Sequence, residues 1–161
     1  MTEALEVSIG KMLQQRRQTL AVGESCTGGL IGHHITNVPG SSEYFMGGVV
    51  SYAYEAKVNL LGVRWETLHA HGAVSCETVL EMARGVRQLL GADIGLAVSC
   101  IAGPGGATLT KSVGTSWAAL VTQEGEWARH FLFNGDRLEN KESLSQASLQ
   151  LLLDYLQDNL S

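Results

Sequence analysis

A short stretch of small polar residues, ESCTGG at 24–29, follows an apolar run at 20–22. A helix-like apolar pattern comes next, and the free N–H groups at a helix N-terminus attract an anion such as a phosphate. Gly28 and Gly29 let the backbone bend at this point. The pattern also fits ordinary N-capping by Ser25 or Thr27. Glu24 would repel an anion unless it points away or is paired.

Three further stretches contain residues suited to chemistry or close approach. Ser41 and Ser42 follow a Pro-Gly turn, where serines usually serve the turn itself. Lys57 follows a Val- and Tyr-rich segment; most such lysines are solvated, but one held in a partly buried site loses pKa and can act as a base. The stretch SCIAGPGG at 99–106 matches neither a P-loop nor a dinucleotide fingerprint, and its small residues allow a ligand close to the backbone.

The histidines and cysteines indicate no metal site, and we expect no cofactor. The histidine pairs at 33–34 and at 69 and 71 diverge on predicted helices, and neither Cys-x-x-Cys nor His-Glu-x-x-His occurs. Cys26, Cys76 and Cys100 are an odd number and widely spaced. With no secretion signal in view, we expect three reduced thiols in a cytoplasmic protein.

Alternation of apolar runs and helical patterns predicts the elements that position these residues. Strands are expected at 19–25, 47–54, 94–101, 114–123 and 127–133, and helices at 3–17, 28–37, 55–61, 65–71, 75–90 and 137–159. This order predicts an α/β fold with helices on both faces of a sheet that the last hairpin makes mixed. Ligands bind outside the carboxyl ends of parallel strands, which selects 24–29, 52–57 and 101–106.

Length and composition narrow the class of protein. The chain has 161 residues, 45% hydrophobic and 17% charged, as expected of one folded domain over residues 1–161. The formal net charge is -5, and no cluster of Lys and Arg forms the basic patch that nucleic-acid binding requires. No apolar run approaches the ~20 residues of a membrane helix. We therefore expect neither nucleic acid nor a membrane as a partner.

Several motifs, taken together and in order, resemble the CinA C-terminal domain family. They are ESCTGG, VPGSSEYFMGGVVSY, EAK, LLGV, HGAVS, CIAGPGG, VGT and NGDR, spanning about residues 23–137. Stand-alone members of that family are nicotinamide-nucleotide amidases (PncC-like), and longer members carry an additional N-terminal domain. The resemblance implies a three-layer α/β/α sandwich with a mixed, mostly parallel sheet. It also implies hydrolysis of nicotinamide mononucleotide to nicotinate mononucleotide and ammonia, in pyridine nucleotide salvage.

The same resemblance implies roles for particular residues. Ser42 is favoured as nucleophile and Lys57 as its base, with Ser25 and Tyr52 assisting, in a Ser/Lys variant of triad chemistry. Backbone N–H groups at 27–29 are expected to hold the phosphate, and those at 103–106 the oxyanion or the amide. The implied substrate-binding residues are Glu24, Thr27, Gly28, Gly29, Ala102, Gly103, Gly105, Gly106, Arg137 and Lys141.

Strand geometry conflicts with the pairing of Ser42 and Lys57 in one chain. The predicted strand at 47–54 separates them, and at ~3.3 Å per residue it is about 23 Å long. Either the loop at 41–44 curls back, or Ser42 reaches Lys57 of a neighbouring subunit, which favours a site shared in a homodimer or higher homo-oligomer. If neither holds, Ser25 is the better-placed nucleophile within one chain.

Three residues depart from the family pattern. Tyr54 stands where Asn is usual, Cys100 where Gly is usual, and Lys141 where an arginine is expected. Lysine cannot reproduce the two-pronged contact of arginine with a phosphate or carboxylate. These departures favour two alternatives to an active amidase on nicotinamide mononucleotide: a protein that binds a nucleotide without turnover, or an amidase with a shifted substrate.

Overall fold

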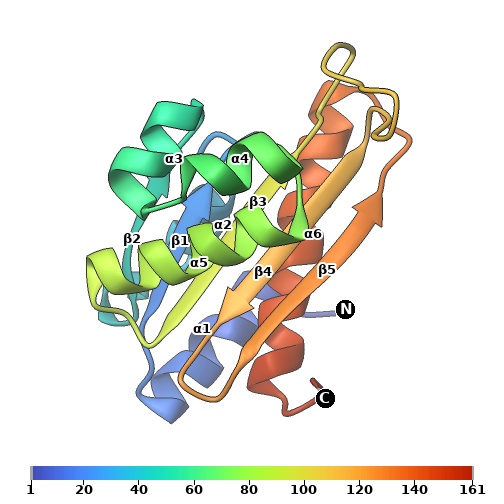
Figure 1. The fold of residues 1–161 in the computed structure, drawn as a ribbon. Helices are drawn as coiled ribbons and strands as arrows, with labels where there is room; N and C mark the ends of the chain where they lie inside the picture. Colours follow the sequence, from blue (N-terminus) through green and yellow to red (C-terminus); the bar gives the residue numbers. More distant parts are fainter. Residues whose placement is uncertain (1, 161) are drawn as a thin grey trace.

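The protein is built around one five-stranded sheet. In the computed structural model, which describes residues 2–160, the strands lie in the order β2-β1-β3-β4-β5 (Figure 1). They are β1 (Leu20–Glu24), β2 (Phe45–Val50), β3 (Ile94–Cys100), β4 (Thr115–Val121) and β5 (Glu126–Leu132). β1 pairs in parallel with both β2 and β3, whereas β4 runs antiparallel to β3 and β5 to β4. The predicted mixed sheet is confirmed.

Helices cover both faces of the sheet and complete the expected α/β/α sandwich (Figure 1). They are α1 (Leu5–Arg16), α2 (Leu30–Thr36), α3 (Tyr54–Leu61), α4 (Trp65–His71), α5 (Cys76–Leu90) and α6 (Arg137–Leu156), with a 3-10 turn η1 (Ser41–Glu43). One core cluster joins α1, α2 and α6 to side chains such as Val22 and Leu96. A second joins α3, α4 and α5 to the opposite face, at Ala21 and Ala97. Alternate residues of each central strand therefore enter opposite cores.

Local sequence signals explain why the helices lie where they do. Ser75 accepts a hydrogen bond from the N–H of Thr78, and Gly91 ends α5 in the left-handed conformation, as the sequence predicts. A Cβ on Gly85 of α5 would lie 1.7 Å from the carbonyl oxygen of Leu61. Only glycine therefore lets α5 support the end of α3, the helix that carries Lys57.

The boundaries differ from the predictions mainly around the expected site. β2 ends at Val50 rather than at residue 54, because the chain leaves the sheet and exposes Tyr52 and Tyr54. α2 begins at Leu30 rather than at 28, because Gly28 and Gly29 take positive φ angles of 62° and 107°. Within residues 2–160, no helix is long and apolar enough to span a membrane, and no group of metal-ligating side chains is found.

Candidate active site

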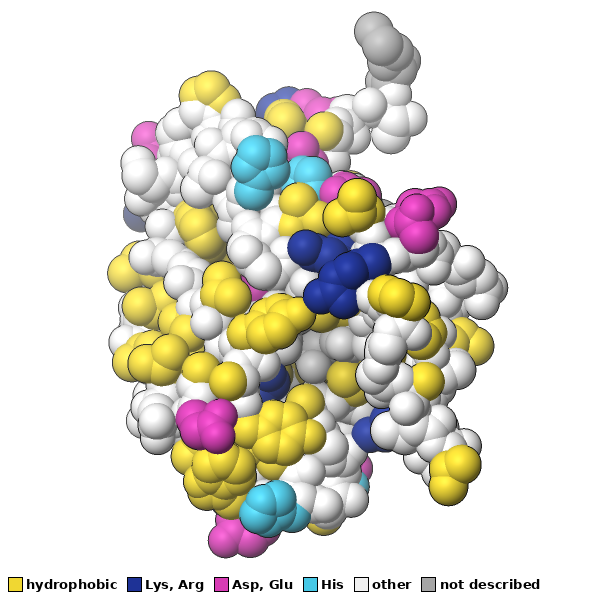
Figure 2. Space-filling view, turned by 90° about the horizontal axis from the view of Figure 1, so that it is seen from above, with side chains coloured by type: hydrophobic (Ala, Val, Ile, Leu, Met, Phe, Trp, Pro, Cys, Tyr) yellow, Lys and Arg dark blue, Asp and Glu magenta, His cyan; other side chains and the backbone are white. Residues whose placement is uncertain are grey.

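A cavity of about 340 Å³ lies at the carboxyl ends of the parallel strands β1, β2 and β3. The three segments selected from the sequence meet there, as expected for a sheet of this kind. Figure 2 shows this face from above, with apolar side chains and Lys or Arg side chains bordering a hollow. The side chains of Cys26, Tyr52, Tyr54, Cys100, Lys111 and Arg137 line the cavity together with the loop at 101–106.

Lys57 is the most unusual side chain beside this cavity. It lies in the first turn of α3 and has no solvent-exposed surface. Its Nζ donates to Ser25 Oγ at 2.9 Å and to the carbonyl oxygens of Ser51 at 2.7 Å and Tyr52 at 3.1 Å. Burial disfavours the charged form and lowers the pKa of Lys57 from 10.5 to about 8. The expectation of a functional, buried lysine thus has a physical basis.

The three contacts of Lys57 direct its lone pair when the amine is neutral. An ammonium has three N–H donors, enough for Ser25 and both carbonyl groups. A neutral amine has two, and carbonyl oxygens can only accept. The two carbonyl groups therefore keep the two N–H donors, and the lone pair faces the hydroxyl of Ser25. A hydroxyl aimed at a neutral amine is the arrangement of a nucleophile and its general base.

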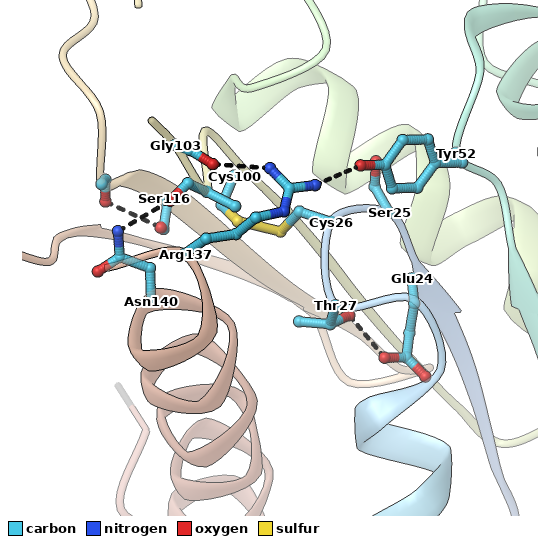
Figure 3. Close-up of a disulfide and its surroundings, with 12 residues drawn as sticks. Glu24, Ser25, Cys26, Thr27, Tyr52, Cys100, Gly103, Ser116, Arg137 and Asn140 are labelled. Carbon is cyan, nitrogen blue, oxygen red and sulfur yellow. Dashed lines mark hydrogen bonds between the residues drawn. A yellow bond between two sulfur atoms is a disulfide. The ribbon is translucent and has the colours of Figure 1, made fainter. Parts of the chain in front are cut away.

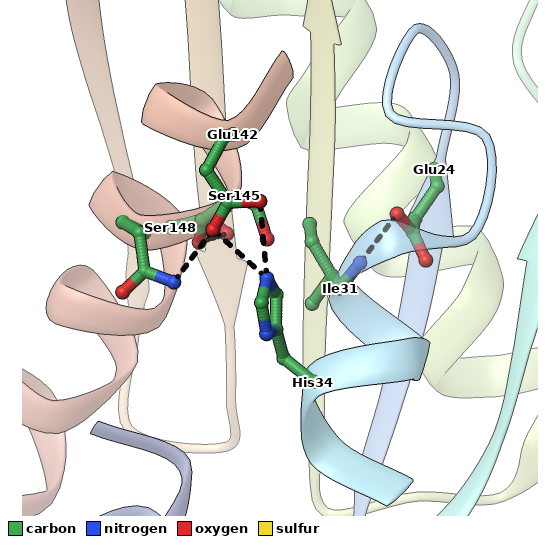
Figure 4. A network of polar contacts seen from close by, with 7 residues as sticks. Glu24, Ile31, His34, Glu142, Ser145 and Ser148 are labelled. Atoms are coloured by element: carbon green, nitrogen blue, oxygen red, sulfur yellow. Dashed lines mark hydrogen bonds and ion pairs between the residues drawn. The ribbon is translucent and has the colours of Figure 1, made fainter. Parts of the chain in front are cut away.

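Glu24, expected to contact substrate, instead caps α2. Its buried carboxylate accepts hydrogen bonds from Thr27 Oγ1 at 2.6 Å, from Ile31 N at 3.0 Å and from Gly32 N at 3.1 Å (Figures 3 and 4). The N-terminus of α2 therefore already holds a negative charge. The phosphate role expected for the backbone N–H groups of residues 27–29 involves other donors and stays a prediction.

Arg137, at the start of α6, joins two sides of the cavity. Its Nη1 donates to the carbonyl oxygen of Gly103 at 2.8 Å and its Nη2 to the hydroxyl of Tyr52 at 2.9 Å (Figure 3). Asn140, one turn later and buried, donates to the carbonyl oxygen of Ala102 at 3.1 Å. The first turns of α6 thus fix the loop at 102–103. Sequence reasoning missed Asn140, although its spacing of three from Arg137 places both on one helix face.

Ser42 does not approach Lys57 within one chain. It lies exposed in η1, immediately before β2, whereas Lys57 lies beyond the opposite end of that strand. The three N–H donors of Lys57 are also directed at partners from its own chain. The structure thus corrects the pairing of Ser42 with Lys57 in one chain and brings Ser25, the alternative nucleophile, to the lysine. The shared-subunit arrangement stays a prediction.

Lys141 belongs to a separate hollow. Together with Gly28, Gly29, His33 and Leu138 it lines a depression of about 480 Å³ between α2 and α6. Beside it, His34 Nε2 lies 3.0 Å from a carboxylate oxygen of Glu142, which joins the two helices (Figure 4). The predicted substrate-binding residues therefore divide into two groups. Ala102, Gly103, Gly105, Gly106 and Arg137 line the cavity near Lys57, and Gly28, Gly29 and Lys141 do not.

The cysteines provide a second correction. Cys26 and Cys100 form a disulfide, and Cys76 is the free thiol among the described residues (Figure 3). Parallel pairing of β1 with β3 brings the ends of these strands together, so residues 74 apart in sequence have Cα atoms 5.7 Å apart. An odd cysteine count and wide spacing carry no information on this proximity, which explains why the prediction of three reduced thiols was wrong.

Two cavity residues that could contact a substrate were not singled out as binding residues from the sequence. Tyr54 begins α3, three residues before Lys57, and 39% of its surface is exposed. Lys111 comes from the loop after β3, and its Nζ donates to the carbonyl oxygen of His71. Lys111 and Arg137 are the cationic side chains that line the cavity within residues 2–160. No local sequence motif distinguishes Lys111 from a solvated loop lysine.

Comparison with known proteins agrees with this fold along almost the whole chain. Residues 2–156 match the model of the CinA C-terminal domain. A CinA-like protein of Chloroherpeton thalassium is 49% identical over 156 residues, covering 94% of this chain and 37% of the relative. A CinA-like protein of Desulfotalea psychrophila is 47% identical, covering 92% and 36%. The chain thus spans little more than a third of the length of these curated relatives.

Solved structures of comparable length share the fold. A competence-damaged protein (CinA) superfamily protein from Klebsiella pneumoniae superposes with a TM-score of 0.92 at 33% identity, covering 96% of each chain. A competence/damage inducible protein from Agrobacterium tumefaciens has a TM-score of 0.88 at 32% identity, covering 98% of this chain and 99% of that one. The chain therefore belongs to the CinA C-terminal domain family.

Proposed function

We propose that the protein is an amidohydrolase that converts nicotinamide mononucleotide to nicotinate mononucleotide and ammonia. The observation that carries this proposal is the 2.9 Å contact between Ser25 Oγ and the Nζ of the buried Lys57. Cys26, which follows Ser25, and Tyr52, whose carbonyl group accepts from Lys57, both line the cavity, together with the cations Lys111 and Arg137. The family motifs around both residues support this substrate, and Ser25 takes the role of nucleophile that the sequence assigned first to Ser42.

In the first half-reaction, neutral Lys57 accepts the proton of Ser25 while Ser25 Oγ attacks the carboxamide carbon. The carbonyl oxygen becomes an oxyanion, which requires hydrogen-bond donors held in place before the reaction. We assign this role to backbone N–H groups of the 103–106 loop, which Arg137 and Asn140 hold in place through the carbonyl groups of residues 102 and 103.

The tetrahedral intermediate then collapses. The C–N bond breaks, and the protonated Lys57 returns its proton to the leaving nitrogen, which departs as ammonia. Water attacks the acyl-Ser25 ester, with Lys57 accepting a proton from the water and then returning it to Ser25 as the acid product leaves. Because one lysine acts as base and acid in both halves, its pKa of about 8 suits proton transfer in either direction near neutral pH.

The remaining lining residues suit the other parts of this substrate. The nicotinamide ring of the mononucleotide is a pyridinium cation, which aromatic faces attract. Tyr52 and Tyr54 present such faces, with exposed fractions of 58% and 39%. The phosphate requires a cation, and Lys111 on the opposite loop supplies one. Arg137 already donates to Tyr52 and Gly103, so we assign it the role of holding the walls of the cavity in place.

The decisive experiment measures ammonia release from nicotinamide mononucleotide by the wild type and by Ser25→Ala, Lys57→Ala and Ser42→Ala. We expect the first two variants to lose release and Ser42→Ala to retain it. Lys11→Ala, which removes an exposed lysine of α1, is the control for Lys57→Ala. Loss of activity in Ser42→Ala alone would contradict the assignment of Ser25. No release by the wild type, with a raised Tm in the presence of the nucleotide, would favour binding without turnover.

A further inference from the structure

The Cys26–Cys100 disulfide is part of the wall of the cavity. Cys26 is the residue directly after Ser25, and both half-cystines line the same cavity (Figure 3). Their exposed fractions are 5% and 9%, and the exposed remainder faces the cavity that they line. The mechanism above uses neither sulfur atom. A covalent link therefore lies one residue from the proposed nucleophile without taking part in the chemistry.

We propose that the Cys26–Cys100 disulfide is a reversible redox site: oxidised, it holds Ser25 in its catalytic position, and reduction by a small dithiol lowers turnover. The effect on turnover rests on the proposed amidase function. The effect on the conformation of the Ser25 loop does not, and the two are measured separately below.

The two cysteines of the disulfide lie in segments of different rigidity, one in a buried strand and one in a loop. Cys100 is the last residue of β3, a strand whose seven residues are all buried, and it pairs with Ser116 of β4. Cys26 lies in the loop between β1 and α2, followed by Gly28 and Gly29 at positive φ. Glu24 fixes one side of this loop by capping α2. The Ser25 segment is joined to β1 by the peptide bond of Glu24, and the disulfide to Cys100 is its second covalent attachment to the sheet, at β3.

Reduction must change the spacing of these two segments. In thiol–disulfide exchange, a thiolate of the dithiol attacks one cysteine sulfur, the S–S bond breaks, and the second thiol releases the mixed disulfide. Two electrons and two protons pass to the protein, giving two cysteine thiols and the cyclic disulfide of the reductant. Sulfur atoms that were bonded at about 2.0 Å then retreat to van der Waals contact at roughly 3.5–4 Å.

A movement of this size matters for catalysis because Ser25 directly precedes Cys26. Its Oγ lies 2.9 Å from Lys57 Nζ, and a misplacement of about 1 Å can cost about a hundredfold in rate. The flexible Gly28 and Gly29 allow the loop, rather than the sheet, to move. When Ser25 moves away, Lys57 Nζ loses this partner and water can replace it, so the pKa of Lys57 should rise toward its ordinary value.

The position of the disulfide also predicts which class of reductant can reach it. A small dithiol reaches the sulfur atoms through the cavity, and nicotinamide mononucleotide in the same cavity would block that route. Cys76, the remaining cysteine, begins α5 and does not line the cavity. Burial raises the pKa of the Cys76 thiol, which disfavours its reactive thiolate. Cys76→Ser is therefore the matched control, expected to keep the full redox response.

The experiment treats the native protein with dithiothreitol and counts free thiols, which should rise from one to three without unfolding. We expect kcat/KM for nicotinamide mononucleotide to fall at least about tenfold on reduction and to recover on reoxidation. Cys100→Ser should resemble the reduced wild type without any reductant. In parallel, NMR of the Lys57 side chain and amide hydrogen exchange at 25–29 report the conformation of the loop independently of activity.

The proposal is overturned if the reduced protein keeps its kcat/KM and its Lys57 pKa, or if the two additional thiols become accessible only on unfolding. Either result would make the disulfide a purely structural link. Failure of the proposed function has a different signature, namely no ammonia release in either redox state. The NMR and exchange measurements would then decide the redox proposal alone: a raised Lys57 pKa and faster exchange on reduction support it, and unchanged values contradict it.

Discussion

Two segments of this protein place a serine two residues after a glycine and next to a strand, and only one of these serines contacts the buried Lys57. The loop after β1 buries Ser25 against Lys57, whereas the turn before β2 leaves Ser42 exposed. The difference lies in strand direction. β1 and β2 run parallel, so the loop after β1 and the turn before β2 lie at opposite ends of these two strands. Residue type alone does not distinguish these serines; topology does.

The largest expected effect tests whether the two segments cooperate across subunits. Lys57→Ala should lower kcat by about 10²–10⁴-fold, the usual contribution of a general base. Ser42→Ala should be active alone, and mixing it with Lys57→Ala should add no activity, because Ser25 and Lys57 lie in one chain. The measurement is ammonia release after co-refolding of the two variants. Two variants that are inactive alone but active when mixed would show that Ser42 of one chain meets Lys57 of its neighbour, as the sequence analysis favoured.

The pH dependence should show that the Ser25 segment depends on a neutral amine. Lys57 has its pKa lowered to about 8 by burial, so kcat/KM should rise about tenfold per pH unit below 8 and level off above it. Between about 8 and 10.5 the unfolded chain binds more protons at Lys57 than the folded chain does. This group's contribution to stability therefore rises with pH in that window, and unfolding does not produce the plateau. A flat profile from pH 6 to 9 would exclude Lys57 as the base.

The comparison of the Ser25 and Ser42 segments also shows which features can be predicted from the sequence and which cannot. The strand–helix order, the cap at Ser75 and the stop at Gly91 depend on neighbouring residues, and these local predictions are confirmed. The contact between Ser25 and Lys57 joins residues 32 apart, and the disulfide joins residues 74 apart. Such pairs depend on strand register and on the end of the sheet that each loop reaches. A one-dimensional pattern carries neither quantity.

Glu24 illustrates the same limit at close range. Its position at the end of a buried strand looks functional, yet its carboxylate accepts hydrogen bonds from the backbone of the next helix, α2. We expect Glu24→Ala to lower the free energy of unfolding by about 2 kcal/mol, because it leaves buried donors without a partner. Glu43→Ala, in the turn that carries Ser42, is the matched control and should change stability by less than about 0.5 kcal/mol. Equal losses in urea unfolding would refute the capping role.

The smallest effect distinguishes the two hollows that border the first turns of α6. Arg137 bridges Tyr52 and Gly103 at the cavity, whereas Lys141 lines the depression beside α2. Arg137→Ala removes both hydrogen bonds and loosens this wall of the cavity, so we expect the KM for nicotinamide mononucleotide to rise about fivefold, equivalent to about 1 kcal/mol of binding free energy. Lys141→Ala should leave KM within about twofold, since its side chain lies outside the cavity. A larger KM increase in Lys141→Ala than in Arg137→Ala would place the substrate in the depression beside α2. It would also support the phosphate role expected for residues 27–29.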